Sequence, residues 1–277
     1  MKKMKPVRVI AVTSGKGGVG KTNLSVNIGI ALAQKGQRVI LLDADMGLAN
    51  VDILLGMYPK FNLSHVLSGD KTLDEIMLEG PAGLKVIPGA SGIQKMAELS
   101  TIEQAAVIRA FSEIDQDLDV LIVDTAAGIS ASVVNFARAC QEIIVVVCDE
   151  PTSLTDAYAF IKLLNRDYGL SHFHVIANMV QSVQQGQALF QKLTKVTDHY
   201  LDVTLQFEGV VPHDEYLRKS VQKQSPVVVA FPGSKASLAM KTIAGRIENW
   251  PLKSQAGGYI EFFIEKMIQY GSEEYAA

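Results

Sequence analysis

Cysteine is nearly absent from this sequence of 277 residues, in which only Cys140 and Cys148 occur. Two thiols cannot supply the disulfide framework of a small secreted protein or a zinc site of four thiolates. Long apolar runs are lacking too, since no segment reaches the roughly 20 apolar residues that span a bilayer. The apolar run at 7–12 is interrupted by Arg8 and is too short for a signal peptide. These absences predict a cytoplasmic protein.

An excess of charge of one sign is also missing. The 26 lysines and arginines oppose 29 aspartates and glutamates, which leaves a net charge of −3. This balance does not favour a nucleic-acid binder, so no direct contact with nucleic acid is expected. Hydrophobic residues make up 48% of the chain, and the mean hydropathy is +0.18. Such a composition excludes a disordered chain and favours one folded core.

Short β-branched runs alternate along the chain with segments of helix length. Several runs are apolar at successive positions, as in strands that are covered on both faces. The expected strands are 7–12, 38–42, 84–87, 120–123, 143–147, 174–177 and 208–211. A helix is expected over 22–35, where Gly36 would end it. The predicted fold class is α/β, with a doubly wound, mainly parallel sheet flanked by helices.

One glycine-rich segment carries the strongest chemical signal. The run Gly15-Lys16-Gly17-Gly18-Val19-Gly20-Lys21-Thr22 fits the P-loop pattern and lies between an expected strand and an expected helix. Glycines let successive backbone N–H groups turn toward phosphate, and the helix N-terminus adds positive potential. Lys21 would reach the β- and γ-phosphates, and the Thr22 hydroxyl would be a ligand of Mg²⁺. We expect the phosphates to bind along this loop and the following Asn23.

The second lysine of this loop, Lys16, resembles that of the deviant P-loop shared by the MinD, ParA and nitrogenase iron protein families. In these families the lysine crosses a dimer interface and contacts the nucleotide of the partner subunit. The resemblance implies ATP or ADP with Mg²⁺ as cofactors and a homodimer that forms with ATP. Lys16 would then act in trans, somewhat like an arginine finger, and be catalytic together with Lys21.

Acidic residues at two expected strand ends fit the same families. Asp43 and Asp45 follow one strand, and Asp124 ends another at the sheet edge where open α/β sheets bind ligands. The resemblance makes Asp124 a metal-site residue with Thr22, and Asp43 a supporting acid there. It makes Asp45 the catalytic residue that positions the attacking water. From the pattern alone, each carboxylate could instead be a helix cap or a turn former.

Two turns after expected strands resemble the adenine site of these families. Asn178 follows the strand expected at 174–177, and Val211, Pro212 and Asp214 follow or end the next one. In the families, the corresponding asparagine and the main chain around the proline hold adenine. The alternative is a pair of ordinary turns.

The segment 43–52 looks like the MinD branch, and 149–153, 162–167 and 192–196 closely resemble FleN/FlhG flagellar-number regulators. The resemblance implies a slow ATPase that restrains flagellar number and is peripheral at the inner membrane or cell pole. The implied partners are an SRP-type GTPase of the FlhF type and a FleQ-type transcription activator. Two alternatives are a ParA-like ATPase that positions DNA or protein cargo, and an adaptor with negligible hydrolysis. Cys140 and Cys148 are expected to be buried, which argues against an iron–sulfur carrier.

The C-terminal end is expected to be separate from the ATPase body. The predicted division is a body over 1–253, a linker over 254–258, and an amphipathic helix with its tail over 259–277. Between Tyr259 and Tyr270, five apolar side chains would share one helix face: Ile260, Phe263, Ile264, Met267 and Ile268. This face would either pack on the protein or insert into lipid. The resemblance implies reversible docking onto lipid. Because Lys266 is the only basic residue among four glutamates, we predict that this membrane contact is weak and occurs only with ATP.

Overall fold

The computed structural model describes residues 7–90, 100–114, 117–252 and 261–263. Within these residues, eight strands form one sheet in the order β3-β4-β2-β5-β1-β6-β7-β8. Neighbouring strands are parallel, except that β3 runs antiparallel to β4. The strands are β1 (Arg8–Ser14), β2 (Val39–Ala44), β3 (Leu78–Glu79), β4 (Lys85–Ile87), β5 (Val120–Ala127), β6 (Glu142–Val147), β7 (His172–Val180) and β8 (Thr204–Pro212). The predicted fold class is confirmed, and every expected strand is present.

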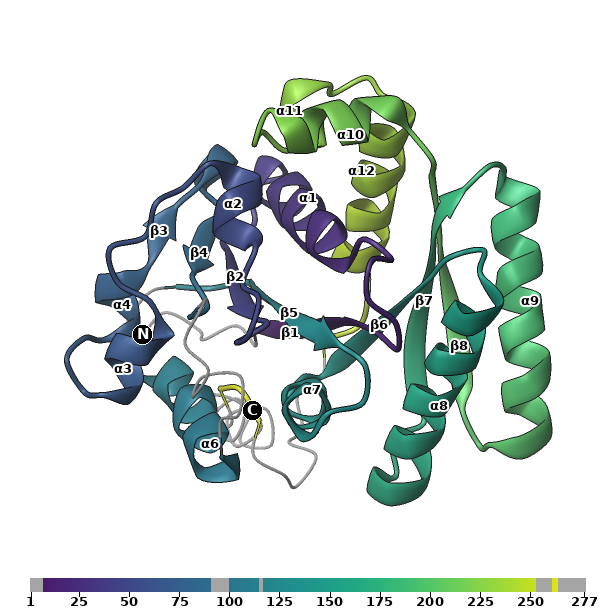
Figure 1. Cartoon of the computed structure of the whole chain (residues 1–277), viewed down its shortest axis with the longest axis horizontal. Helices are drawn as coiled ribbons and strands as arrows, with labels where there is room; N and C mark the ends of the chain where they lie inside the picture. The colour runs from purple at the N-terminus through teal and green to yellow at the C-terminus, as the bar shows by residue number, and fades with distance from the viewer. Residues whose placement is uncertain (1–6, 91–99, 115–116, 253–260, 264–277) are drawn as a thin grey trace, which may run out of the picture.

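Helices cover both faces of the sheet (Figure 1). One face carries α1 (Lys21–Gln34), α2 (Val51–Leu55), α10 (Glu215–Gln222), α11 (Val227–Ala230) and α12 (Lys235–Glu248). The other carries α3 (Leu63–Leu67), α4 (Leu73–Ile76), α6 (Thr101–Ala110), α7 (Ala131–Arg138), α8 (Pro151–Tyr168) and α9 (Val183–Tyr200). Single turns of 3₁₀ helix lie at Pro81–Gly83 (η1) and Phe111–Glu113 (η2).

The core therefore has two apolar layers separated by the sheet. All residues of β1, β2 and β6 are buried, which explains why the middle of each strand is a run of successive apolar residues without alternation. Leu24 and Ile28 of α1 fill one layer, and Phe160 of α8 and Phe173 of β7 fill the other. Each such side chain contributes about 1.5–3 kcal/mol when fully buried.

The position of the site follows from the connections of β1 and β5, which are neighbours in the sheet. The chain leaves β1 into α1 on one face, and it leaves β5 into α7 on the other. The sheet therefore has a topological switch point between them, and ligands of open α/β sheets bind in the crevice outside the carboxyl ends of such strands.

A buried polar cluster joins the last three strands. Both ring nitrogens of His174 (β7) form hydrogen bonds. Nδ1 lies 2.7 Å from Glu208 Oε1, and Nε2 lies 3.2 Å from Glu142 Oε2. The indole of Trp250 stacks on this ring, with centroids 3.7 Å apart. Arg8 Nη2 donates to the Trp250 carbonyl oxygen at 2.6 Å, which ties the end of α12 to β1.

The C-terminal segment differs from the expected helix where it is described. Glu261, Phe262 and Phe263 form a turn, and Phe263 has a positive φ of 59°. Phe262 and Phe263 are both buried, and both rings pack edge-on against Phe111 at 5.0 and 6.0 Å. In a helix, adjacent side chains point about 100° apart, so the turn lets both rings enter the core. The rest of 259–270 lies outside the described residues.

Within the described residues, no helix combines the length and the apolar character needed to cross a membrane.

Candidate nucleotide-binding site

The glycine loop between β1 and α1 has the backbone of a phosphate-binding loop. Gly18 and Gly20 have φ values of 80° and 87°, a left-handed conformation that glycine adopts without strain. Gly20 is also the N-cap residue of α1, and no side chain in the described part of the chain caps this helix end. A Cβ atom at Gly20 would meet Asn178 Nδ2 at 2.5 Å, and one at Gly15 would overlap the backbone of Asp156 in α8. The loop is therefore tightly packed, and the positive end of the α1 dipole remains available to an anion.

Lys21 and Asp124 bring a cation and an anion to the start of α1. Lys21 is only 8% exposed, and burial lowers the pKa of its ammonium group, although Asp124 and Asp45 oppose this. Asp124 is 1% exposed, and burial raises the pKa of its carboxyl to about 6, although Thr22, Ser25 and Lys21 oppose the rise. Both groups are therefore held in a low-dielectric site where a bound ion would interact strongly.

One oxygen of Asp124 is left without a protein partner. Ser25 Oγ donates to Asp124 Oδ1 at 2.8 Å, whereas the buried Asp124 Oδ2 makes no hydrogen bond within the described residues. A buried carboxylate oxygen without a partner is costly unless a ligand satisfies it. Its chemistry, together with the Thr22 hydroxyl, fits Mg²⁺, which prefers oxygen ligands and binds proteins through one or two carboxylates plus substrate phosphates. Among the described residues, no cluster of three or more His, Cys, Asp and Glu forms a closed metal cage.

Asp43 lies beside Asp124, because the two are register partners on β2 and β5. Its carboxylate accepts hydrogen bonds from the backbone N–H groups of Asn50 at 2.9 Å and Val51 at 3.0 Å, and Asp45 N donates to it at 3.2 Å. Burial and the nearby Asp124 raise the pKa of Asp43 well above its ordinary value. Asp43 therefore organises the loop that carries Asp45.

Asp45 lies at the edge of the site and is half-buried. Its Oδ1 atom accepts a hydrogen bond from Leu48 N at 3.1 Å, so the carboxylate stabilises a short turn in the loop after β2. It also lies close enough to Lys21 to raise the pKa of that side chain. The structure thus brings Asp43, Asp45, Asp124 and Lys21 to one sheet edge.

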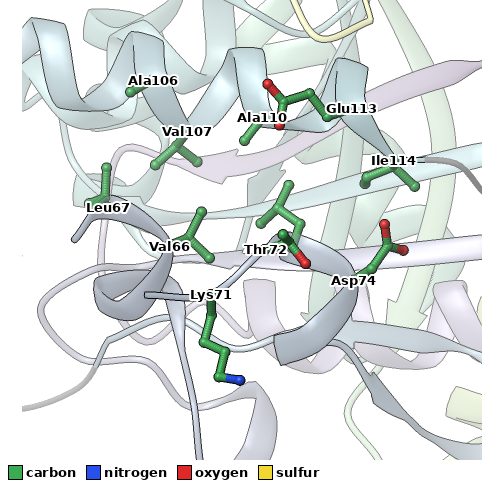
Figure 2. A pocket seen from close by; sticks show the side chains of 11 residues that line it. Val66, Leu67, Lys71, Thr72, Asp74, Ala106, Val107, Ala110, Glu113 and Ile114 are labelled. Atoms are coloured by element: carbon green, nitrogen blue, oxygen red, sulfur yellow. The ribbon is translucent and has the colours of Figure 1, made fainter. Parts of the chain in front are cut away.

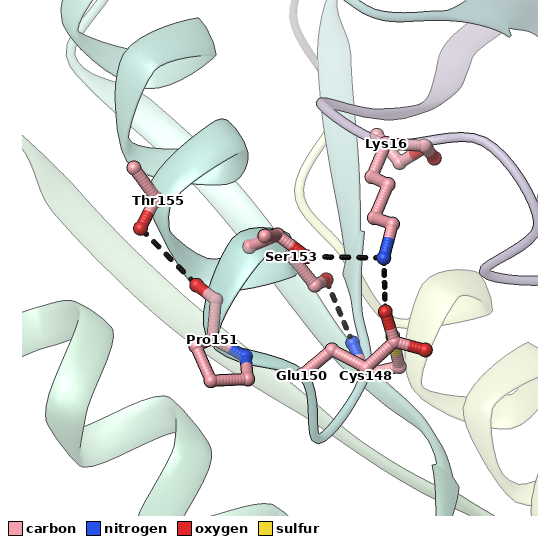
Figure 3. A network of polar contacts seen from close by, with 8 residues as sticks. Lys16, Cys148, Glu150, Pro151, Ser153 and Thr155 are labelled. Carbon is pink, nitrogen blue, oxygen red and sulfur yellow. Dashed lines mark hydrogen bonds and ion pairs between the residues drawn. The ribbon is translucent and has the colours of Figure 1, made fainter.

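Lys16 points away from the core of the loop and pairs with α8. Figure 3 shows its Nζ atom hydrogen-bonded to Glu150, just before α8, and it also donates to Thr152 Oγ1 at 3.0 Å. The hydrogen bond with Glu150 raises the pKa of the Lys16 ammonium group. The Ser153 hydroxyl accepts from Cys148 N at 3.1 Å, which fixes the turn that carries Glu150. Sequence reasoning did not predict this pair.

The expected adenine residues lie together at the ends of β7 and β8. Asn178 is buried; its Nδ2 donates to the Val19 carbonyl oxygen at 2.7 Å, and its Oδ1 makes no hydrogen bond within the described residues. The Val211 side chain is fully buried, so only its backbone can face a ligand. Asp214 caps α10 through Tyr216 N at 2.9 Å and accepts from Ala236 N at 2.9 Å. Its carboxylate is thus occupied by backbone groups.

Ser25 is a second residue that sequence reasoning missed. It is buried and hydrogen-bonds both Asp124 and the Lys21 carbonyl oxygen. The available signal was its spacing, because Ser25 follows Thr22 by three residues and therefore lies on the same side of α1.

A separate hollow lies apart from these residues (Figure 2). It has a volume of about 320 Å³ and lies between α3, α4 and α6, with Val66, Val107 and Ile114 in its wall and Lys71 and Asp74 at its rim. None of the predicted site residues lines it.

Comparison with known proteins agrees with the geometry. The ParA family model, described as "NUBPL iron-transfer P-loop NTPase", matches residues 5–248. Antiactivator FleN of Pseudomonas aeruginosa is 59% identical over 98% of this chain and 96% of its own length. Flagellum site-determining protein YlxH of Helicobacter pylori is 33% identical over 95% and 90% of the two chains.

Solved structures share the same architecture. The MinC:MinD cell division protein complex of Aquifex aeolicus contains a chain that is 27% identical, with a TM-score of 0.72 over 89% of this chain and 98% of that chain. MinD of Pyrococcus horikoshii complexed with Mg-ADP has a TM-score of 0.73 at 24% identity over 88% and 96% of the chains. This second likeness concerns the fold alone.

Both cysteines of the chain are buried, as the sequence predicts. Cys140 and Cys148 are free, and both are buried, with 8% and 5% of their surface exposed. Burial also raises the pKa of the Cys140 thiol well above its ordinary value, which makes it a poor metal ligand. The chain belongs to the MinD/ParA family of P-loop NTPases, in its FleN/FlhG branch of antiactivators.

Proposed function

We propose that this chain is an ATP-dependent monomer–dimer switch that restrains flagellar number. The observation that carries the proposal is the meeting of an uncapped P-loop helix, Lys21 and the unpartnered Asp124 oxygen at one sheet edge. This arrangement suits a nucleotide triphosphate with a divalent cation, because it offers a cradle for phosphate and one free carboxylate oxygen. The antiactivator relative supports the flagellar role.

The phosphate and metal residues have separate roles in this proposal. The backbone of Gly15 to Asn23 holds the phosphates, and Lys21 places its charge on the β- and γ-phosphates. Thr22 and Asp124 would hold Mg²⁺, with Asp43 as a supporting acid; the ion would neutralise charge on the phosphates during hydrolysis. Desolvation of Lys21 and Asp124 strengthens both interactions.

Hydrolysis needs a positioned water and a second subunit. Asp45 is exposed enough to reach solvent and close to Lys21, so it would orient the attacking water. Lys16 would contact the nucleotide of the partner subunit in an ATP dimer. It must first leave Glu150 and Thr152 of its own chain.

The base of the nucleotide would lie near the ends of β7 and β8. The Asn178 Oδ1 atom, which has no partner within the described residues, could accept a hydrogen bond from the 6-amino group of adenine, whereas guanine has a carbonyl oxygen at this position of the ring. The backbone at Val211 and Pro212 would complete the site. The Asp214 carboxylate is occupied by backbone groups and so would act by holding this loop in place.

The output of the switch would be the binding of partners. A FleQ-type transcription activator is the first partner, in keeping with the name of the 59% identical relative. An SRP-type GTPase of the FlhF type is the second. The C-terminal segment would add a weak membrane contact in the ATP dimer. Before nucleotide binds, the buried rings of Phe262 and Phe263 would restrain it.

Two measurements test the proposal together. The first is analytical ultracentrifugation with ATP, ADP and no nucleotide, where only ATP should give a dimer. The second is pull-down of a purified FleQ-type activator by the same three samples. A chain that stays monomeric with ATP, or that binds the activator equally in all three states, is not such a switch.

A further inference from the structure

Basic side chains gather on the sheet face that carries α10, α11 and α12. From His213 to Ile247, six basic residues stand against two acidic ones, whereas acidic residues outnumber basic ones in the whole chain. Five of the six lie on α10, in the turn that follows it or at the start and middle of α12. We call them the basic patch: Arg218, Lys219, Lys223, Lys235 and Lys241.

Two aromatic rings hold the patch together. The rings of Tyr216 and Phe231 are 4.9 Å apart. Lys219 Nζ lies 5.3 Å from the centroid of Tyr216, and Lys223 Nζ lies 5.4 Å from that of Phe231. Lys241 Nζ donates to the carbonyl oxygen of Pro232 at 3.3 Å, so the lysines of α10 and α12 surround the same loop. Their positions are therefore constrained rather than scattered over a solvated surface.

The charge of this patch is not neutralised within the described part of the chain. None of its five residues forms an ion pair there. The nearby Asp214 carboxylate is occupied by Tyr216 N and Ala236 N, which leaves Glu215 as the one neighbouring exposed acid in α10. Clustered like charges repel one another, so an anionic partner would relieve this repulsion.

Apolar side chains are exposed within the same surface. Leu238 is 55% exposed and lies between Lys235 and Lys241 at helical spacing on α12. Val221 is 38% exposed on α10, three residues after Arg218 and therefore on the same side of the helix. A phosphate backbone would use the cations and leave these apolar side chains in water. An acidic protein segment with apolar anchors would use both.

The ring contacts and the fold argue against other polyanions. Lys219 and Lys223 already lie over Tyr216 and Phe231, and these cation–π contacts compete with the stacking of nucleic-acid bases on the two rings. The C-terminal residues Phe262 and Phe263 lie in the apolar layer on the opposite face of the sheet. A membrane reached from that face would not meet the basic patch.

We infer that the basic patch is the docking surface for an acidic, partly apolar segment of a protein partner. Resting on the proposed function, the partner is the FleQ-type transcription activator. The patch is tied to the nucleotide site, because Asn27 of α1 accepts a hydrogen bond from Val228 N of α11 at 3.1 Å. Asp214, which follows Pro212, also joins α10 to α12.

The test compares two double charge reversals. Lys219→Glu/Lys223→Glu alters the patch. Lys192→Glu/Lys195→Glu makes the same change in charge on the exposed surface of α9, which covers the opposite face of the sheet. Binding to a purified FleQ-type activator is measured for both and for the wild type by interferometry. The patch variant should bind about tenfold or more weakly, and the α9 variant should bind as the wild type does. ATP-induced dimerisation of each variant confirms that it is folded.

Other outcomes decide against the inference. Equal activator binding by the patch variant and the wild type overturns the docking surface and leaves the proposed function intact. No binding by the wild-type chain overturns the proposed function and this inference with it. Duplex DNA without a specific site and phosphatidylglycerol vesicles are the two remaining probes. If the wild type binds either one and only the patch variant loses that binding, the patch serves a nucleic acid or a membrane. Leu238→Ser, which keeps every charge, should also weaken activator binding.

Discussion

Lys16 and Glu150 are 134 positions apart in the sequence, yet the ammonium group of Lys16 donates a hydrogen bond to the carboxylate of Glu150. The P-loop lysine expected to act on a second subunit is thus bound to its own chain. Side-chain exposures of 36% and 54% make this a surface pair, which water and salt weaken. Such a contact can hold Lys16 in the monomer and still release it when ATP closes a dimer.

Glu150→Gln should make the ATP dimer form more readily. The amide keeps the size of the side chain but removes its charge, so Lys16 is freer to reach a partner. We expect dimerisation at a protein concentration a few-fold lower than for the wild type, as exposed pairs contribute little. Analytical ultracentrifugation with ATP measures the change. Lys16→Ala is the control, and it should bind ATP yet stay monomeric. A Lys16→Ala variant that dimerises normally contradicts the trans role.

Lys21→Gln should abolish ATP binding. Lys21 is almost buried at the first position of α1, where its point charge would meet the β- and γ-phosphates in a low-dielectric site. Titration with a fluorescent ATP analogue measures the affinity. Lys35→Gln, at the other end of the same helix, removes an exposed charge and should bind ATP normally. Retention of micromolar affinity by Lys21→Gln would refute the P-loop assignment.

Asp124→Asn should stabilise the nucleotide-free protein at pH 8 while abolishing hydrolysis. Burial raises the pKa of Asp124 from 3.8 to about 6. Between these values the folded state binds more protons than the unfolded state, so stability falls as pH rises through this window. A shift of about 2 units corresponds to roughly 3 kcal/mol at most. The melting temperature should therefore rise above that of the wild type at pH 8 and change less at pH 4.

The control for this experiment is Asp198→Asn on the exposed surface of α9. Its melting temperature should follow the wild type at both pH values. If Asp124→Asn is instead less stable at pH 8, the Ser25 hydrogen bond outweighs the desolvation of the carboxylate.

The sheet and the P-loop could be read from the sequence because both are local patterns. Each expected strand is a run of consecutive apolar residues, and the loop is a contiguous glycine motif before a helix. The missed strand, Leu78–Glu79, has two residues and is held by the antiparallel register of β4. No local pattern encodes such a strand.

Contacts between distant segments could not be predicted in the same way. The pairing of Lys16 with Glu150 depends on how the turn before α8 packs against the P-loop. In the sequence, each of these side chains suggests only a solvated charge. The ring of His174 meets Glu142 and Glu208 because three strands are neighbours in the sheet. The turn at Phe262 depends on space left beside Phe111 and was expected as a helix. Tertiary packing decides each of these.

His174→Gln should destabilise the protein more at pH 6 than at pH 9. Burial lowers the pKa of His174, but hydrogen bonds and charges from Glu142 and Glu208 outweigh it and leave the pKa raised. The imidazolium therefore contributes its full stability below pH 6.5 and loses it as pH rises through the folded-state pKa. Breaking such a buried pair costs about 3 kcal/mol or more. Burial lowers the pKa of Arg8 and the charge of Glu142 opposes this, but an arginine side chain stays charged throughout this pH range.

Thermal melts of His174→Gln and the wild type from pH 6 to pH 9 measure this dependence. His213→Gln, an exposed histidine after β8, is the matched control and should follow the wild type. A difference between His174→Gln and the wild type that stays constant with pH means that the ring acts by packing on Trp250 alone.

Phe262 should restrain the C-terminal segment before ATP binds. Its ring is fully buried between Phe111 at 5.0 Å and Phe136 at 6.5 Å, and its N–H group donates to the Ala139 carbonyl oxygen at 3.1 Å. Removing a buried phenylalanine side chain costs about 3–5 kcal/mol. The lost packing energy belongs to the turn at 261–263, so Phe262→Ser should release the C-terminal segment while the sheet stays folded.

Liposome flotation measures the consequence. Asp45→Ala should bind ATP but hydrolyse it poorly, and so remain in the ATP dimer. The wild type should not float without ATP, Asp45→Ala should float weakly with ATP, and Phe262→Ser should float without ATP. The apolar side chains of the segment then insert into lipid, each contributing up to about 1.5–3 kcal/mol when fully buried, against repulsion of its glutamates by anionic lipid. Asp45→Ala and the wild type, each truncated after Gly258, are the controls and should stay in solution. Equal flotation of full-length and truncated forms would leave the segment with no role at the membrane, and its aromatic turn would then serve only the packing of the core.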